Sequence, residues 1–253
     1  MSRQMPFPSD LDLPISSDVA DSADAGPLRI GGFVPLTTID YPGELAAVVF
    51  LQGCPWRCRY CQNGALIDPS ATPVIAWSQI SAFLERRRGL LDAVVFSGGE
   101  PTLQSALPAA MTEVRGLGFK VGLHTAGSVP KRLARLLPLL DWVALDIKAL
   151  PEGYPAITGI PQSGEAAWES LSLIQASGVQ LEVRTTVMPQ WTALDLATLA
   201  AALAQQGVRR YAVQACETRH ALDPLLSPSA IPLAQLAGAI NPASFDRFVL
   251  RGH

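Results

Sequence analysis

Short apolar segments alternate with longer segments rich in alanine, leucine and arginine along most of this sequence, and this alternation constrains the fold more than any other feature. The apolar segments are the expected strands, at Ala46–Leu51, Ala93–Ser97, Phe119–His124, Trp142–Lys148, Gln180–Val187 and Arg210–Ala215. Helices are expected between them, near residues 77–88, 102–116, 130–140, 165–177 and 192–206. Apolar strands separated by helices are typical of parallel βα units whose sheet is buried on both faces.

Six strands with five intervening helices predict a partial (β/α)6 TIM-like parallel barrel of the α/β class, because a full eight-fold barrel needs two further units. A short helix near 233–240 and a strand-like segment at Phe245–Arg251 follow the last unit. No linker divides this region, so we expect residues 29–253 to form a single domain.

Residues 1–28 differ in composition from the rest of the chain. They hold five aspartates against one arginine, together with several prolines and serines and no sustained hydrophobic periodicity. Such a segment cannot bury enough apolar surface to order itself. We expect a disordered, flexible acidic tail.

Composition also narrows the function. A formal net charge of −3 argues against a protein that grips nucleic acid directly. No apolar run approaches the ~20 residues that span a bilayer, and the chain does not start like a signal peptide. Four cysteines are too few for a disulfide-stapled scaffold. The expected location is therefore the cytoplasm, without a membrane partner.

Cys54, Cys58 and Cys61 follow the first expected strand with the spacing C-x3-C-x2-C. A compact loop of this kind can aim three thiolates at one place, and soft ligands suit an iron–sulfur cluster or zinc. A [4Fe–4S] cube bound by three cysteines keeps one iron free for an amine and a carboxylate of a small molecule. The alternative is a zinc knuckle completed by Cys216 or His124.

Polar residues also follow the other expected strands, where parallel barrels gather their reactive groups. They are Ser97-Gly98-Gly99-Glu100, His124-Thr125-Ala126-Gly127, Asp146-Ile147-Lys148, Arg184 and Gln214-Ala215-Cys216-Glu217. The carboxyl ends of parallel strands meet at one rim, so we expect these groups to converge.

These residues carry a resemblance. The cysteine motif with an aromatic residue, Tyr60, before its last cysteine is similar to that of the radical S-adenosylmethionine (radical SAM) enzymes. The runs Ile30-Gly31-Gly32-Phe33-Val34-Pro35, Thr38-Ile39-Asp40-Tyr41-Pro42-Gly43 and Phe50-Leu51-Gln52-Gly53-Cys54 resemble the glycyl-radical-enzyme activases. Within that group, the chain most resembles activating proteins of the anaerobic ribonucleoside-triphosphate reductase.

The resemblance implies a site and two cofactors, a [4Fe–4S] cluster and S-adenosylmethionine (SAM). The three cysteines would hold the cluster, Gly98 and Gly99 would lie along the methionine moiety, and Glu100 would pair with its ammonium group. Tyr60 would lie near the adenine, and Asp146 and Lys148 would contact the ribose and the carboxylate. Arg184 is a weaker candidate for the carboxylate or for gating. His124 replaces the aspartate of the pyruvate formate-lyase type, so it could contact SAM or be structural.

The resemblance further implies a reaction. The reduced cluster would cleave SAM, and the 5′-deoxyadenosyl radical would take a hydrogen atom from a glycine of a partner enzyme, with anaerobic ribonucleoside-triphosphate reductase favoured. A flavodoxin- or ferredoxin-type protein would donate the electron. Two alternatives stay open: a radical SAM enzyme that acts on another glycyl-radical enzyme or on a small molecule, and a non-catalytic, zinc-stapled protein.

Overall fold

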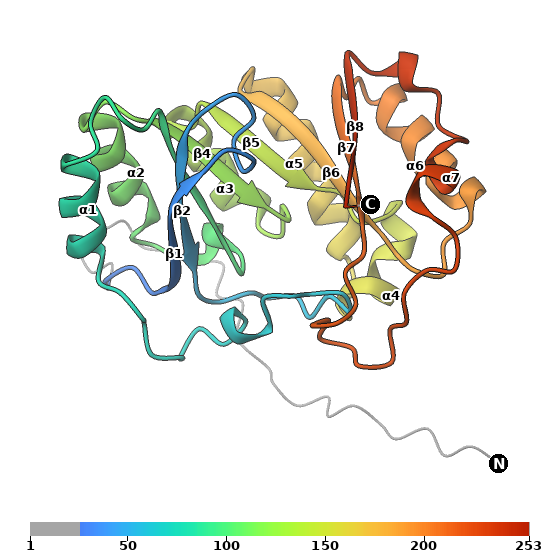
Figure 1. Ribbon diagram of the computed structural model, residues 1–253, viewed down its shortest axis with the longest axis horizontal. Helices are drawn as coiled ribbons and strands as arrows, with labels where there is room; N and C mark the ends of the chain where they lie inside the picture. The colour runs from blue at the N-terminus through green and yellow to red at the C-terminus, as the bar shows by residue number, and fades with distance from the viewer. Residues whose placement is uncertain (1–25, 253) are drawn as a thin grey trace.

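A single curved sheet organises the computed structural model, which describes residues 26–252 (Figure 1). Its eight strands are paired in chain order, and β1 and β8 form the two edges. The strands are β1 (Ile30–Thr37), β2 (Ala46–Leu51), β3 (Ala93–Gly98), β4 (Lys120–Thr125), β5 (Trp142–Asp146), β6 (Gln180–Val187), β7 (Arg210–Ala215) and β8 (Arg247–Arg251). Strands β2 to β8 are parallel, and only β1 is antiparallel to its neighbour.

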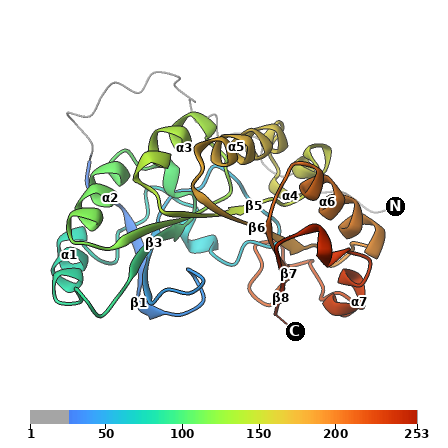
Figure 2. The ribbon, with the colours of Figure 1, turned by 90° about the horizontal axis from the view of Figure 1, so that it is seen from above.

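The helices follow the outer side of this sheet, as Figure 2 shows from above. They are α1 (Trp77–Glu85), α2 (Leu107–Gly116), α3 (Pro130–Leu136), α4 (Tyr154–Thr158), α5 (Ser163–Ser177), α6 (Ala193–Gln205) and α7 (Leu233–Ala237). Local chemistry sets several of their ends. Thr192 and Asp195 form a reciprocal capping box at the start of α6, and Gly178 ends α5 in the left-handed conformation.

The core has two parts because both faces of the sheet are buried. The larger part lies between the sheet and the outer helices. A smaller cluster fills the inner face, where the ring of Tyr41 stacks on that of Trp142 with centroids 4.8 Å apart. Tyr41 belongs to the hairpin between β1 and β2, so this hairpin covers one end of the barrel interior.

The predicted fold class is confirmed, and all six expected strands lie within two residues of their predicted limits. The sheet nevertheless has eight strands, not six. The strand-like tail forms β8. Strand β1 was missed because Gly31, Gly32 and Pro35 weaken a strand pattern, and an antiparallel edge strand tolerates such residues. Helix α4 was missed because it has only five residues.

Most of the predicted acidic tail, residues 1–25, lies outside the described residues. Leu28, the last residue of the predicted tail, is buried in the larger part of the core, so the tail was predicted to extend too far. Among residues 26–252, no helix is both long enough and apolar enough to cross a membrane.

Candidate active site

A cavity of about 430 Å³ opens at the carboxyl ends of the strands. Residues from almost every strand line it, as the sequence predicted. From the predicted set these are Cys54, Cys58, Tyr60, Cys61, Gly98, Gly99, His124, Asp146, Lys148 and Arg184. The parallel sheet brings together groups that are up to 130 residues apart, because each follows a strand or lies in its carboxyl-terminal half, near the same rim.

The cysteine-bearing loop is fastened at its root and on both sides. At the root, Gly53 N–H donates to Leu66 O over 2.7 Å. On one side, Arg59 N–H donates to Ile157 O, in α4, over 2.9 Å. On the other side, Asp223 N–H donates to Arg59 O over 2.9 Å, and the Asp223 carboxylate accepts from Arg59 Nε over 2.8 Å. The loop is thus shaped by chain segments from both halves of the sequence.

Gly98 and Gly99 are required by backbone packing as well as by any ligand. A Cβ atom at Gly98 would lie 2.2 Å from Leu51 O, and one at Gly99 would lie 2.3 Å from Gly53 O. Gly98 also has a φ of +121°, which a side chain disfavours. The close approach lets Gly99 N–H donate to Leu51 O over 2.9 Å, so these glycines lock the root of the cysteine loop against β3.

The side chain of Glu100 is not placed where the resemblance put it. It is fully buried and does not line the cavity. One oxygen accepts from Thr102 and Thr125, and the other accepts from the N–H of Ala126 over 3.0 Å. Burial raises the pKa of Glu100, and these hydrogen bonds oppose that shift. Glu100 therefore links the end of β3 to the end of β4. Its carboxylate is not open to the ammonium group of a ligand in the cavity, as the resemblance had implied.

Lys148 supplies a buried positive charge beside the cysteine loop. Its Nζ lies 3.6 Å from Asp146 Oδ2 and 5.4 Å from the centre of the Tyr60 ring. Burial alone lowers the pKa of Lys148, but the groups around it, Tyr60 and Cys58 foremost, raise it well above its usual value. The amine is thus a fixed cation. Asp146 is about half exposed on its side chain, so it also faces the opening.

Cys58 is buried, and Cys54 and Cys61 are partly buried. Burial raises the pKa of Cys54 to about 12. Burial also raises the pKa of Cys58, and the positive charge of Lys148 partly opposes this rise. Metal binding must therefore displace protons from these thiols, and the thiolates formed would lie in a shielded site next to a cation.

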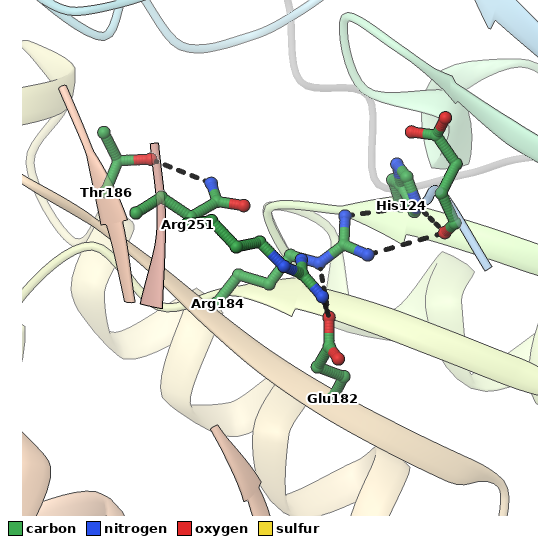
Figure 3. A network of polar contacts seen from close by, with 7 residues as sticks. His124, Glu182, Arg184, Thr186 and Arg251 are labelled. Atoms are coloured by element: carbon green, nitrogen blue, oxygen red, sulfur yellow. Dashed lines mark hydrogen bonds and ion pairs between the residues drawn. The ribbon is translucent and has the colours of Figure 1, made fainter. Parts of the chain in front are cut away.

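His124 and Arg184 meet on the inner wall (Figure 3). His124 Nε2 lies 2.8 Å from the carbonyl oxygen of Asp40 and 3.3 Å from Arg184 NH1. Burial and, next, the Arg184 charge lower the pKa of His124 to about 3, so the ring is neutral. A carbonyl only accepts, so Nε2 carries the proton. The structure thus gives His124 a buried hydrogen bond as well as a face on the cavity.

Several cavity residues were not singled out from the sequence, among them Thr186 and Arg251. Gln214 was noted only as part of a strand end. Arg251 ends the strand-like tail and had no motif around it. Its position beside β7 is a signal that only the strand pairing supplies, since Gln214 pairs with Arg251 in the register.

The donor set distinguishes the two kinds of metal site considered from the sequence. Within residues 26–252, no three Cys, His, Asp or Glu side chains are placed to hold one metal ion together. A cube does not require this, because each thiolate binds a different iron atom. His124 bonds to Asp40, and Cys216 does not line the cavity. The residues present therefore fit an iron–sulfur cluster better than a zinc knuckle.

Comparisons with known proteins agree with this geometry. Residues 48–203 match the model of the radical SAM superfamily. A Methanocaldococcus jannaschii protein named "Putative glycyl-radical enzyme activating enzyme" is 30% identical over 247 residues, covering 88% of this chain and 95% of that protein. A pyruvate formate-lyase-activating enzyme of Clostridium pasteurianum is 30% identical over 174 residues, covering 65% of this chain and 70% of the relative.

Solved structures show the same fold at low sequence identity. Streptococcus suis SuiB, in a crystal structure with its precursor peptide SuiA, superposes with a TM-score of 0.67 at 13% identity. The match covers 81% of this chain and 48% of SuiB, so the chain spans about half of that protein's length. The cysteine loop, the strand-end cavity and the match over residues 48–203 agree: the chain belongs to the radical SAM superfamily.

Proposed function

We propose that this protein is a glycyl-radical-enzyme activase whose partner is an anaerobic ribonucleoside-triphosphate reductase. One observation carries the proposal: three cysteine thiols and a buried lysine line the same strand-end cavity. The names of the relatives, which include activating enzymes of glycyl-radical proteins, support the reaction class. The choice of the reductase as partner rests on the motifs that precede the cysteine loop, at residues 30–43.

In this proposal Cys54, Cys58 and Cys61 hold the cluster, and SAM occupies the rest of the cavity. When bound, the reduced cluster would donate one electron to SAM, and SAM would supply a 5′-deoxyadenosyl radical with methionine as the leaving group; hydrogen transfer from a glycine Cα would then give 5′-deoxyadenosine. The electron comes from a flavodoxin- or ferredoxin-type protein. The chain itself supplies position, charge and exclusion of water.

Each cavity residue then has a physical task. Lys148, a fixed cation 3.6 Å from Asp146, attracts the SAM carboxylate, and Asp146 accepts from ribose hydroxyls. The backbone at Gly98 and Gly99 faces the cavity without side chains, so the methionine moiety can lie against it. Tyr60 provides an apolar ring beside the loop for the adenine. Glu100 holds the ends of β3 and β4 in place beneath the cavity.

The first experiment measures 5′-deoxyadenosine after anaerobic reconstitution with iron and sulfide, in the presence of SAM and a strong reductant. Wild type should form the product, Cys58→Ala should not, and Cys216→Ala should behave as wild type, because Cys216 lies outside the cavity lining. No product from fully reconstituted wild type would contradict the radical chemistry.

A second arm tests the partner. The reductase is incubated with the reconstituted enzyme, SAM and reductant, and a glycyl radical is sought by electron paramagnetic resonance. A radical on the reductase, lost with Cys58→Ala, is the expected result. Product formation without a radical on the reductase would reject this partner and retain the SAM chemistry.

A further inference from the structure

A buried carboxylate joins two arginines on one wall of the cavity (Figure 3). Glu182 lies in β6 with its side chain 3% exposed. Its Oε1 accepts from Arg184 Nε over 2.8 Å and from Arg251 NH2 over 2.9 Å. Arg184 is in the same strand, whereas Arg251 comes from the last residue of β8. The carboxyl-terminal strand thus brings a second guanidinium to the cavity.

The charges of this group do not balance. Two guanidinium groups share one carboxylate, and His124, the other ionisable group in contact with Arg184, is neutral. A surplus positive charge on partly buried side chains is costly unless an anion accompanies it. Asp146 is the register partner of Arg184 in the neighbouring strand β5, but its carboxylate also lies 3.6 Å from Lys148 Nζ, and this second cation offsets its charge.

Several N–H donors of this group also lack an acceptor. His124 Nε2 donates to Asp40 O, so it cannot also accept from Arg184 NH1, which lies 3.3 Å away. Within residues 26–252, Arg251 Nε and NH1 make no hydrogen bond, and the side chain keeps 28% of its surface exposed. A guanidinium presents its donors in a planar fork that matches a carboxylate.

We propose that Arg184 and Arg251, held together by Glu182, form a binding site for a carboxylate of the molecule that gives up the hydrogen atom. The neighbouring Thr186 and Gln214 add polar groups to the same wall, and Gln214 Nε2 donates to Thr186 Oγ1 over 3.4 Å. The carboxylate belongs to an acidic side chain of the partner's glycine segment, or to a small acid. Binding of the partner's acidic side chain rests on the proposed function, whereas binding of a small acid does not.

The test measures binding to oxidised, SAM-loaded holoenzyme by ligand-observed nuclear magnetic resonance, so it needs no turnover. One pair of probes is the peptide N-acetyl-Gly-Glu-Gly-amide and its Gln counterpart. The other pair is glutarate and its neutral diamide. In at least one pair, the acidic probe should bind about ten-fold more tightly than the neutral one. Arg251→Gln should remove that preference, and Arg251→Lys, which keeps the charge, should restore part of it.

Arg209→Gln is the matched control, because it removes the same charge from a surface pair, where Arg209 is 79% exposed. It should keep the full preference.

A preference for the acidic peptide assigns the site to the partner segment. A preference for glutarate alone retains the carboxylate site and argues against the proposed function. No preference in either pair overturns the inference. One further result would overturn the inference. If Arg251→Gln raised the SAM dissociation constant by the same factor as it weakened probe binding, the arginines would be holding the carboxylate of SAM itself.

Discussion

The carbonyl oxygen of Asp40 accepts a hydrogen bond from His124 Nε2 over 2.8 Å, across 84 residues of sequence. Asp40 lies in the hairpin between β1 and β2, and His124 lies in β4. The same carbonyl is 3.4 Å from Arg184 NH2. The hairpin that covers one end of the barrel therefore also orients the polar wall of the cavity.

A first prediction concerns pH. The pKa of His124 falls from 6.5 to about 3 on folding. Between these two pH values, the unfolded chain therefore carries a proton on this ring and the folded chain does not. This contribution to stability is present above about pH 6.5 and is lost as the pH falls below it, by at most about 1.4 kcal/mol per pH unit. Urea unfolding at pH 7 and pH 5 should show a larger loss in wild type than in His124→Gln. An equal loss in both proteins would contradict the buried neutral ring.

A second prediction concerns Gly98. Gly98→Ala places a Cβ atom 2.2 Å from Leu51 O at a φ of +121°, and neither backbone can move far within a buried sheet. We expect a loss of more than about 3 kcal/mol in the free energy of unfolding, measured on the metal-free protein. Gly116→Ala is the control, because a Cβ atom there meets nothing within 4 Å. Similar stability of the two variants would show that ligand approach alone requires Gly98.

A third prediction concerns the fastening of the cysteine loop. Asp223→Asn removes the charge that Arg59 Nε contacts over 2.8 Å, and because this pair is partly exposed, global stability should fall by less than about 1 kcal/mol. The loop itself should loosen, so a chelator should remove iron several-fold faster, followed by the loss of visible absorbance. Asp246→Asn, which breaks the exposed pair with Arg209, should leave the rate unchanged. Equal rates in the two variants would refute the fastening role.

A fourth prediction concerns Lys148. Lys148→Met keeps much of the buried volume and removes the cation 3.6 Å from Asp146. If Lys148 attracts the SAM carboxylate, the SAM dissociation constant should rise at least about ten-fold, as measured by equilibrium binding to the reconstituted protein. Lys131→Met, on the exposed surface of α3, should not change it. An unchanged constant in Lys148→Met would assign the carboxylate to other residues.

Much of the fold could be predicted because it follows from local pattern. Ala46–Leu51 is continuously apolar, which is how a parallel strand buried on both faces must look. The Ile30–Thr37 strand could not be recognised, since its glycines and proline are tolerated only because it lies at an antiparallel edge. Edge position is a property of the sheet and not of the segment.

For the site, too, some features could be predicted from local sequence and others could not. Cys54, Cys58 and Cys61 lie within one short loop, so their spacing alone indicates a shared metal centre. Glu100 sits beside the glycines in sequence, but its carboxylate turns inward to Thr125 and Ala126, a choice made by burial and by the available N–H and O–H donors.

The sequence by itself determined the alternation of strands and helices and the cysteine loop, because both depend on residues that are close along the chain. Only the tertiary structure decided that Arg251 contacts Glu182, 69 residues away, and that the carbonyl oxygen of Asp40 accepts a hydrogen bond from His124. Those contacts depend on strand order and register, which are set when the whole sheet buries its two faces, and no local pattern encodes them.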